Sequence, residues 1–437
     1  MSLIAKILLL FYQIFSTLLL PIFFLIIIFR KSQNKECSKN YLQKFAITNF
    51  DKNLLQENKL IWVHAVSVGE SNSAWNLIDE ILKNSPNNRV LFTTTTLTSA
   101  NLIKQKILVN SSYQGQVIHQ FFPLDSYFVV KKFLKFWSPR ACIFLESELW
   151  PNYLMIAKKL QILCYLVNAR ISKKSLNKWQ KIGKIGFNIF DYFSLIFAQN
   201  EENKINIQKF TKQEVCCYGN LKSQSSKLPI NEKLLNDLQS QIGKRKIFMA
   251  VSTHSGEESQ MIEVHKKIKQ FYPDLLSIII IRHPQRANEV MKLLSNENFI
   301  LRSKNQTISQ DTEFYIVDTI GEVGTFLSLV NAAFIGGSLV DVGGHNPFEL
   351  LRMGCLPISG NKIYNFLDVY HEIINNNAGI IVKDCQQLIE EFIKLSNNQE
   401  LLQTMIDNGS SLIKQNNLIS QNIINNIFNH IKNIKNQ

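Results

Sequence analysis

Short apolar runs alternate with amphipathic, helix-like stretches along most of the chain. In the first half the runs cover residues 60–66, 90–95, 117–121, 141–145, 163–167, 195–198 and 215–218. In the second half they cover residues 247–251, 276–281, 314–317, 332–335 and 356–358. Strands separated by helices in this way predict βαβ units, and therefore parallel sheets covered by helices.

A polar stretch at 223–244 interrupts this alternation and predicts a boundary between two domains. The chain of 437 residues also exceeds the length at which one hydrophobic core usually keeps growing. We expect an α/β protein with two Rossmann-like domains that face a cleft, over 31–225 and 226–437, preceded by a segment at 1–30. After Ile413 the pattern predicts an amphipathic helix rich in Asn and Ile, and the first domain is one candidate surface for it.

The N-terminal segment predicts a membrane anchor. Residues 7–29 include no charged side chain, and a helix of this length, rising about 1.5 Å per residue, crosses a hydrocarbon core of about 30 Å. A cleaved signal peptide is disfavoured, because the apolar stretch is too long and no small-x-small cleavage site follows it. Since Gln13, Ser16 and Pro21 interrupt the apolar pattern, a tilted or interfacial helix stays open as an alternative.

Basic residues predict the orientation of this anchor. They are Lys6 before the segment, and Arg30, Lys31, Lys35, Lys39 and Lys44 after it. By the positive-inside rule, everything downstream lies in the cytoplasm. We therefore expect a single-pass transmembrane helix, with both domains on the cytoplasmic side.

Composition narrows the classes of partner. A net charge of +14 suits nucleic acid, an anionic membrane surface or a polyanionic substrate. The lysines are dispersed and no RNP-like or zinc-finger pattern occurs, so we expect no nucleic-acid partner. The seven cysteines include no C-x-x-C pair and mostly lie in apolar runs, as reduced thiols without disulfides do.

The phrase Ile61-Trp-Val-His-Ala-Val-Ser-Val-Gly-Glu70 joins a strand to the start of a helix. Ligands of open parallel sheets bind at the carboxyl ends of the strands, so Glu70 stands where a substrate is expected. A carboxylate there can accept a proton from a substrate hydroxyl as a general base. The alternative is a helix-start Glu that interacts with the macrodipole, which would lower its pKa and weaken it as a base.

Two further carboxylates follow a buried strand in the phrase Glu146-Ser-Glu-Leu-Trp-Pro-Asn152. Glu146 and Glu148 suit the binding of acceptor hydroxyls or the support of a base, and Pro151 suits the first turn of a helix. Metal ligation is the alternative, but neither a D-x-D motif nor a His cluster accompanies them.

A glycine-rich phrase, Gly336-Gly-Ser-Leu-Val-Asp-Val-Gly-Gly-His-Asn-Pro-Phe-Glu349, follows a strand in the second half. Paired glycines allow a ligand to approach the backbone closely, and a helix at Pro347 would direct its amides at a phosphate. Glu349 would hold ribose hydroxyls. The candidate binding residues here are Gly336, Ser338, Gly343, Gly344, His345, Asn346 and Glu349.

Other loops supply hydroxyl and cationic groups that suit a phosphate or an acidic sugar. The candidates are Ser252, Thr253 and His254 after one strand, Arg282, His283 and Pro284 after the next, and Lys222 between the domains. The motifs of P-loop enzymes, classical dehydrogenases, esterases and zinc proteases do not occur in the sequence.

Taken in order, these phrases resemble those of the Kdo transferase family. The resemblance lies in His64-Ala-Val-Ser-Val-Gly-Glu70, Glu146-Ser-Glu-Leu-Trp-Pro-Asn152, Asn168-Ala-Arg-Ile-Ser172, Gly219-Asn-Leu-Lys222, Ser252-Thr-His254, Arg282-His-Pro284 and the glycine-rich phrase. Their order and spacing match over nearly the whole chain. Departures are small: Ile171 stands where Leu is common, and Asp341-Val342 lie inside the glycine-rich phrase.

The resemblance implies a GT-B glycosyltransferase of glycosyltransferase family 30 that acts in lipopolysaccharide core biosynthesis. It implies transfer of 3-deoxy-D-manno-octulosonic acid (Kdo) from CMP-Kdo to a lipid A precursor, lipid IVA. Glu70 is then the general base, Glu146, Glu148 and Arg170 bind the acceptor or support the base, and the second domain binds CMP. We expect a single inverting displacement with no metal and no other cofactor.

Two rival functions stay open at this point. One is a GT-B transferase that uses a UDP-sugar, which donor competition would distinguish. The other is a membrane-bound module that binds a nucleotide or lipid carrier without catalysis, and such a module would tolerate loss of Glu70. The number of Kdo residues transferred depends on the shape of the acceptor pocket, which the sequence does not give.

Overall fold

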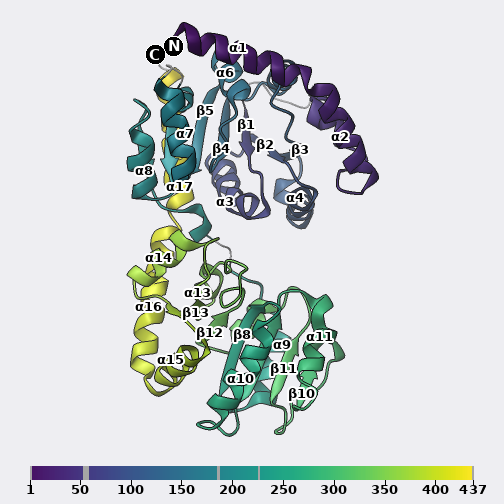
Figure 1. The fold of residues 1–437 in the computed structure, drawn as a ribbon, viewed down its shortest axis with the longest axis vertical. Helices are drawn as coiled ribbons and strands as arrows, with labels where there is room; N and C mark the ends of the chain where they lie inside the picture. Colours follow the sequence, from purple (N-terminus) through teal and green to yellow (C-terminus); the bar gives the residue numbers. More distant parts are fainter. Residues whose placement is uncertain (1, 53–58, 185–187, 225–226, 436–437) are drawn as a thin grey trace. The chain divides into compact units, whose positions relative to one another are not determined.

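A computed structural model describes residues 2–52, 59–184, 188–224 and 227–435. The chain forms two compact units, Met1–Lys222 with Asn417–Gln437, and Ser223–Asn416 (Figure 1). Each unit is built on one seven-stranded parallel sheet with helices packed on it. These sheets confirm the predicted α/β class.

The first sheet has the strand order β3-β2-β1-β4-β5-β6-β7. Its strands are β1 (Leu60–His64), β2 (Arg89–Thr94), β3 (Val117–Phe121), β4 (Ala141–Leu145), β5 (Leu163–Ala169), β6 (Leu195–Ala198) and β7 (Val215–Cys217). The connecting helices are α3 (Val68–Asn84), α4 (Leu97–Val109), α5 (Tyr127–Trp137), α6 (Pro151–Lys159), α7 (Lys173–Lys184) and α8 (Glu201–Gln208). Alternate residues of β1 serve opposite faces: Trp62 joins one hydrophobic cluster, and Ile61 and Val63 join the other.

The second sheet has the strand order β10-β11-β9-β8-β12-β13-β14. Its strands are β8 (Ile247–Thr253), β9 (Leu276–Ile281), β10 (Phe299–Leu301), β11 (Phe314–Val317), β12 (Ala332–Ile335), β13 (Leu356–Gly360) and β14 (Ile380–Val382). The helices are α9 (Glu232–Ile242), α10 (Glu257–Lys269), α11 (Ala287–Leu293), α12 (Val323–Leu327), α13 (Phe348–Leu351), α14 (Leu367–Asn375), α15 (Cys385–Asn397) and α16 (Gln399–Asn416).

Two central strands continue past their predicted ends through a bulge. The register of β5 shifts between Val167 and Ala169, and that of β8 shifts between Val251 and Thr253. The residues inside these shifts, Asn168 and Ser252, have left-handed backbone with φ of 55° and 59°. Bulges bend a strand and redirect the side chains that follow, and they are common beside active sites.

The C-terminal helix α17 (Ile419–Lys435) belongs to the first unit and packs against α3. Its buried isoleucines are Ile419, Ile423, Ile424, Ile427 and Ile431, which share a cluster with Leu77 and Ile78 of α3. Spacings of three and four residues place these side chains on one face of the helix.

The N-terminal apolar segment forms two helices rather than one. They are α1 (Leu3–Leu18) and α2 (Leu20–Ser32), bent by 44° at the break. Pro21 lies in the first turn of α2, where its missing amide hydrogen interrupts the backbone hydrogen bonds. Neither helix alone has the length and apolarity of a membrane span; only the bent pair together meets those requirements, by length and composition.

Candidate active site

Glu70 lies in the first turn of α3, which follows β1 at the carboxyl edge of the first sheet. Ser67 is the N-cap of α3, and its hydroxyl accepts a hydrogen bond from the Glu70 amide at 3.2 Å. In return, the Glu70 carboxylate accepts from the Ser67 hydroxyl at 2.9 Å and from the Val66 amide at 3.0 Å. This reciprocal capping arrangement fixes the position of the carboxylate at the helix start.

The surroundings of Glu70 favour a stronger base. Burial raises the pKa of its carboxyl above the ordinary value, and the negative charges of Glu146 and Glu148 raise it further. Hydrogen bonds from Val66 and Ser67 act in the opposite direction. The net direction is opposite to the one that the helix macrodipole alone would produce, and it suits proton abstraction near neutral pH.

Glu146 and Glu148 follow β4, the strand beside β1. Glu146 has left-handed backbone with φ of 55°, and its carboxylate pairs with the Lys222 ammonium group at 2.8 Å. Glu148 accepts a hydrogen bond from the Trp150 indole at 2.6 Å and lies 3.5 Å from Nε2 of the buried His64. Three carboxylates and one ammonium group therefore gather at this edge.

Lys222 reaches the site from the last turn of the first unit. The buried side chain of Asn168, inside the bulge of β5, accepts a hydrogen bond from the Leu221 amide at 3.0 Å. Asn168 thus fixes the backbone beside Lys222. The sequence groups Lys222 with the donor-binding candidates, and the structure pairs it with Glu146 inside the first unit.

Arg170 lies on the loop after β5 and connects to the loop after β4. Its amide donates to the Glu146 carbonyl at 3.4 Å, and its carbonyl accepts from the Ser147 hydroxyl at 2.7 Å. The Arg170 side chain is exposed. It therefore shares the edge with the carboxylates and presents a guanidinium group to solvent.

In the second unit the loops after β8, β9 and β12 meet at the carboxyl edge, because these strands are neighbours. The Nε2 atoms of His254 and His345 lie 2.9 Å apart, with ring planes inclined by 16°. The centroid of the His283 ring is 5.6 Å from that of His254. Three histidines that are far apart in the sequence thus form one cluster.

The pKa values of two of these histidines are lowered. Burial, followed by the charges of Arg282, His254 and His283, lowers the pKa of His345 to about 4. Burial and the neighbouring cations also lower the pKa of His254. Both rings are therefore neutral near pH 7 until an anion arrives, since a nearby negative charge favours the protonated form.

Arg282 and Glu349 lie at the rim of this cluster, and both side chains are exposed. Surrounding protein raises the pKa of the Glu349 carboxyl through partial desolvation, and the Arg282 charge opposes this shift. The pair offers a guanidinium group and a carboxyl group to a polar ligand.

A carboxylate absent from the predicted set, Glu257, holds the glycine-rich loop. Its side chain is fully buried at the first turn of α10. It accepts hydrogen bonds from the amides of Gly337, Ser338 and Leu339, at 2.6, 3.0 and 3.0 Å, and from the His254 amide at 3.0 Å. One carboxylate therefore fixes the two loops that present His254 and His345.

Several predicted phosphate contacts have partners inside the protein. The Gly336 amide donates to the Val251 carbonyl, and the Gly344 amide donates to the Gly337 carbonyl, each at 2.8 Å. The buried Ser338 hydroxyl donates to the Ile335 carbonyl and accepts from the Gly360 amide. These groups shape the glycine-rich loop. The side chains of Arg282 and the three histidines are therefore the principal groups available to a ligand.

Close packing explains two of the glycines. A Cβ atom on Gly336 would lie 2.5 Å from the Ser252 carbonyl oxygen. One on Gly343, where φ is 100°, would lie 2.3 Å from the Asn365 amide nitrogen. Neither position accommodates a side chain without movement of its neighbours.

Thr253 and Pro284 help to hold the loops of the histidine cluster in place. The buried Thr253 hydroxyl donates to Glu258 at 3.0 Å, and Glu258 accepts two bonds from the Arg286 guanidinium at 2.8 and 3.1 Å. Pro284 begins the turn that places Arg286 there. Glu258 is completely buried, so this ion pair anchors the loop after β9 to α10.

Asn346 precedes α13, and its side-chain oxygen accepts from the Phe348 amide at 3.1 Å. The predicted helix after Pro347 is present, but α13 spans only four residues. So short a helix has a small dipole, which weakens the expected contribution of its N-terminus to phosphate binding.

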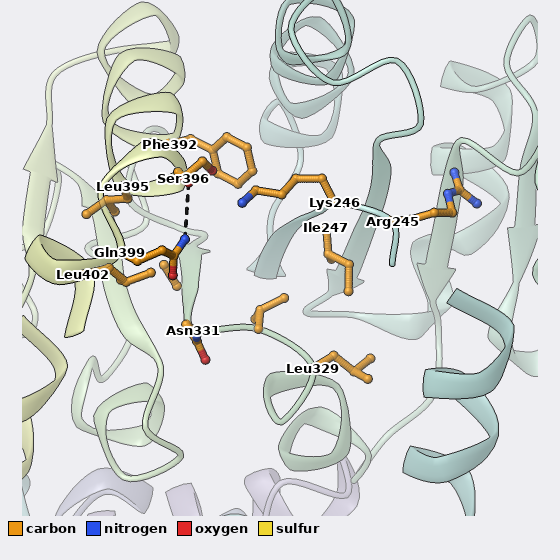
Figure 2. A pocket seen from close by; sticks show the side chains of 12 residues that line it. Arg245, Lys246, Ile247, Leu329, Asn331, Phe392, Leu395, Ser396, Gln399 and Leu402 are labelled. Atoms are coloured by element: carbon orange, nitrogen blue, oxygen red, sulfur yellow. Dashed lines mark hydrogen bonds between the residues drawn. The ribbon is translucent and has the colours of Figure 1, made fainter. Parts of the chain in front are cut away.

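Neither a metal cluster nor the pocket at the start of β8 and β12 adds to this site. Within 2–52, 59–184, 188–224 and 227–435, no three His, Cys, Asp or Glu side chains form a group that could hold a metal ion. Figure 2 shows a pocket of about 200 Å³ lined by Lys246 and Ile247 at the start of β8 and by Asn331 and Ala332 at the start of β12. It therefore lies at the amino edge, away from the histidine cluster.

The chain was compared with known proteins. Residues 39–225 match the model of the 3-deoxy-D-manno-octulosonic-acid transferase (kdotransferase) family. The 3-deoxy-D-manno-octulosonic acid transferase of Rickettsia bellii is 33% identical over 413 residues, which cover 93% of this chain and 95% of the relative. The transferase of the same name from Haemophilus influenzae is 31% identical, over 82% of this chain and 83% of that protein.

A solved structure is similar in fold. The crystal structure of a glycosyltransferase from Rickettsia africae superposes with a TM-score of 0.57, covering 87% of this chain and 100% of that chain, at 12% identity. The identity to these two named transferases exceeds 30% over most of both chains. The chain belongs to the 3-deoxy-D-manno-octulosonic acid transferase family and is a glycosyltransferase that transfers Kdo.

Proposed function

We propose that this enzyme transfers Kdo from CMP-Kdo to a lipid A precursor, lipid IVA, in lipopolysaccharide biosynthesis. The observation that supports the reaction most directly is the Glu70 carboxylate, held at the end of β1 with a raised pKa. Glu70 removes the proton from an acceptor hydroxyl as that oxygen bonds to the anomeric carbon of Kdo. The bond from that carbon to the CMP phosphate oxygen breaks on the opposite face, so the configuration inverts.

The donor site proposed here is the histidine cluster of the second unit. Arg282, His254, His283 and His345 supply cationic or protonatable groups for the CMP phosphate and the Kdo carboxylate. As the phosphate leaves, such preorganised groups stabilise its developing charge. With the phosphate bound, these side chains provide the charge that a metal ion supplies in other transferases, and the reaction needs no metal.

The acceptor site proposed here is the carboxyl edge of the first unit. Glu146 and Glu148 accept bonds from sugar hydroxyls, while Arg170 and Lys222 offset their charge and suit the phosphates of the acceptor. Because the acceptor is a lipid, we propose attachment to the inner leaflet of the cell inner membrane through residues 3–32, with both units in the cytoplasm.

The test is release of CMP from CMP-Kdo by detergent-solubilised protein, with and without lipid IVA, in EDTA, alongside mass spectrometry of the lipid. Acceptor-dependent release with a Kdo mass increment is expected, and multiples of the increment count the sugars transferred. Release only with added divalent metal would contradict the metal-free mechanism. Turnover of a UDP-sugar, or none of either donor by folded protein, would contradict the donor assignment.

A further inference from the structure

Polar side chains fasten the N-terminal helix α1 along the surface of the first unit. The Tyr12 hydroxyl donates to Asp125 at 2.6 Å, and the hydroxyls of Thr17 and Ser126 lie 3.2 Å apart. The side-chain amide of Asn152 donates to the Ser16 hydroxyl at 3.3 Å. These partners lie at the starts of α5 and α6, and Figure 1 shows α1 lying across the unit beside α6.

The end of α2 is fastened as well. The buried Glu36 carboxylate accepts from the Arg30 guanidinium at 2.8 Å and from the Lys44 ammonium group at 2.7 Å. The rings of Phe24 and Phe45 pack edge to face with centroids 5.5 Å apart. Both helices are therefore held to the unit at more than one point.

These contacts are incompatible with a helix that spans a bilayer over residues 7–29. In that arrangement Ser16 and Thr17 would lie near the middle of the hydrocarbon, about 15 Å from either surface of a core of about 30 Å. Side chains of the cytoplasmic unit would not reach them there. The hydroxyls would also lose their partners in a medium without water.

The outer faces of the two helices are apolar. Leu3, Phe11, Phe15, Leu18, Leu25 and Phe29 are each more than 60% exposed. Large exposed patches of this kind mark interaction surfaces. Since the first 35 residues include no Asp or Glu, no acidic group of this segment opposes contact with an anionic surface.

Exposed lysines lie on the helices next to α1. α5, which α1 contacts, exposes Lys131, Lys132 and Lys135, and α6, which packs on α5, exposes Lys158 and Lys159. Neither helix includes an acidic residue. An apolar face bordered by lysines is typical of helices that lie in the interface of an anionic membrane.

We infer that α1 and α2 lie in the plane of an anionic phospholipid leaflet, on the same side as both units, with the lysines of α5 and α6 at the headgroups. This inference rests on the membrane attachment proposed above. It differs from the single-pass anchor that the sequence predicts, because Tyr12, Ser16 and Thr17, inside the apolar segment, bind α1 to the protein.

The first test locates the N-terminus. In full-length protein with the partly exposed Cys37, Cys216, Cys217 and Cys385 replaced by Ser, Ser2→Cys reports the N-terminus and Gln239→Cys, on the exposed face of α9, reports the cytoplasmic side. We expect a membrane-impermeant maleimide to label both in inverted inner-membrane vesicles and neither in intact spheroplasts.

Labelling of Ser2→Cys, but not Gln239→Cys, in intact spheroplasts would overturn the in-plane arrangement and leave membrane attachment standing. Recovery of the folded protein wholly in the soluble fraction would instead overturn the attachment itself, and the inference with it. The two failures are therefore distinguishable.

The second test uses the contact between Thr17 and Ser126. In the protein with the four partly exposed cysteines replaced by Ser, Thr17→Cys with Ser126→Cys should form a disulfide on mild oxidation of membranes. The replaced oxygens are 3.2 Å apart. The matched control pairs Thr17→Cys with Ser138→Cys, at the opposite end of α5, and should not cross-link. Absence of the first disulfide in active, membrane-bound protein would contradict the arrangement.

Discussion

The ionised form of Glu70 is disfavoured by its own surroundings. Burial and two neighbouring carboxylates raise its pKa in the folded protein above the unfolded value of about 4.3. A group with a raised folded pKa contributes stability that is fully present below the unfolded pKa and is lost as pH rises through the folded pKa. The ionised base therefore lowers the free energy of unfolding near neutral pH.

Replacement of Glu70 by Gln should accordingly raise the melting temperature at neutral pH, and the gain should shrink as pH falls towards about 4. The amide can still accept from Val66 and donate to the Ser67 hydroxyl. Differential scanning calorimetry across this pH range measures the effect. The control is Glu80→Gln, on the same helix and paired with Lys83, which should not raise the melting temperature. A lower melting temperature for Glu70→Gln at pH 7 would contradict the account.

The lowered pKa of His345, about 4, predicts proton uptake on nucleotide binding. The CMP phosphate raises the pKa of the ring, so between the free and bound values binding takes up a proton and weakens as pH rises. Calorimetry of CMP binding in buffers of different ionisation enthalpy measures the uptake. Because CMP itself titrates near pH 6, the difference between wild type and His345→Gln isolates the ring.

That difference should be absent for His371→Gln, an exposed histidine on α14. Equal proton uptake by wild type and His345→Gln would show that His345 does not face the phosphate.

Glu257 should be essential for the glycine-rich loop. In Glu257→Gln the new amide group would face backbone N–H donors that have lost their acceptor. We expect a loss of about 2–3 kcal/mol in the unfolding free energy of the second unit, together with weaker CMP binding. Urea unfolding and CMP titration measure both, with Glu263→Gln on the exposed face of α10 as control; unchanged CMP affinity would contradict the assignment.

Among the elements, the bulge of β5 links the fold to the site. Asn168→Ala removes the acceptor for the Leu221 amide and places Ala at φ of 55°. We expect about 1–2 kcal/mol of backbone strain and about 1–3 kcal/mol for the unpaired amide, with weaker activity because Lys222 is released. Asn168→Gly should show only the cost of the unpaired amide, because Gly adopts this backbone without strain. Asn377→Ala, at φ of 49°, should show only the backbone strain. Equal stability of all three variants would contradict this.

Apolar runs predicted all the strands of the first sheet, and all but two short edge strands of the second. The predicted bounds of β3, β4, β6, β9, β11 and β12 agree with the observed ones. β10 and β14 were missed; each has three residues and lies at an edge of the second sheet, too short for a periodic pattern. The bulges were missed too, since αL residues such as Asn168 and Ser252 leave no mark in the hydrophobic pattern.

The location of the candidate site was predictable from the polar motifs that follow central strands, because topology alone brings such loops together. The hydrogen-bond partners of the residues in the site were not predictable. Glu257 contacts Gly337 from 80 positions away, and only the fold shows that it binds the backbone amides of the glycine-rich loop. The signal available was the adjacent pair of carboxylates at the start of α10, which reads equally well as helix capping.

At the scale of the whole molecule, both units place their polar residues at the carboxyl edges of parallel sheets. The edge with Glu70 suits activation of a hydroxyl, and the edge with Arg282 and the three histidines suits a phosphate leaving group. This division agrees with membership of a Kdo transferase family. It also makes Glu70 the one residue that must act as the base.

The most direct test is therefore acceptor-dependent release of CMP from CMP-Kdo by wild type, Glu70→Gln and Glu80→Gln, with CMP affinity measured in parallel. The account predicts that Glu70→Gln loses about 10²–10⁴-fold in turnover while binding CMP normally, and that Glu80→Gln behaves as wild type. Near-normal turnover by Glu70→Gln would contradict its role as the base.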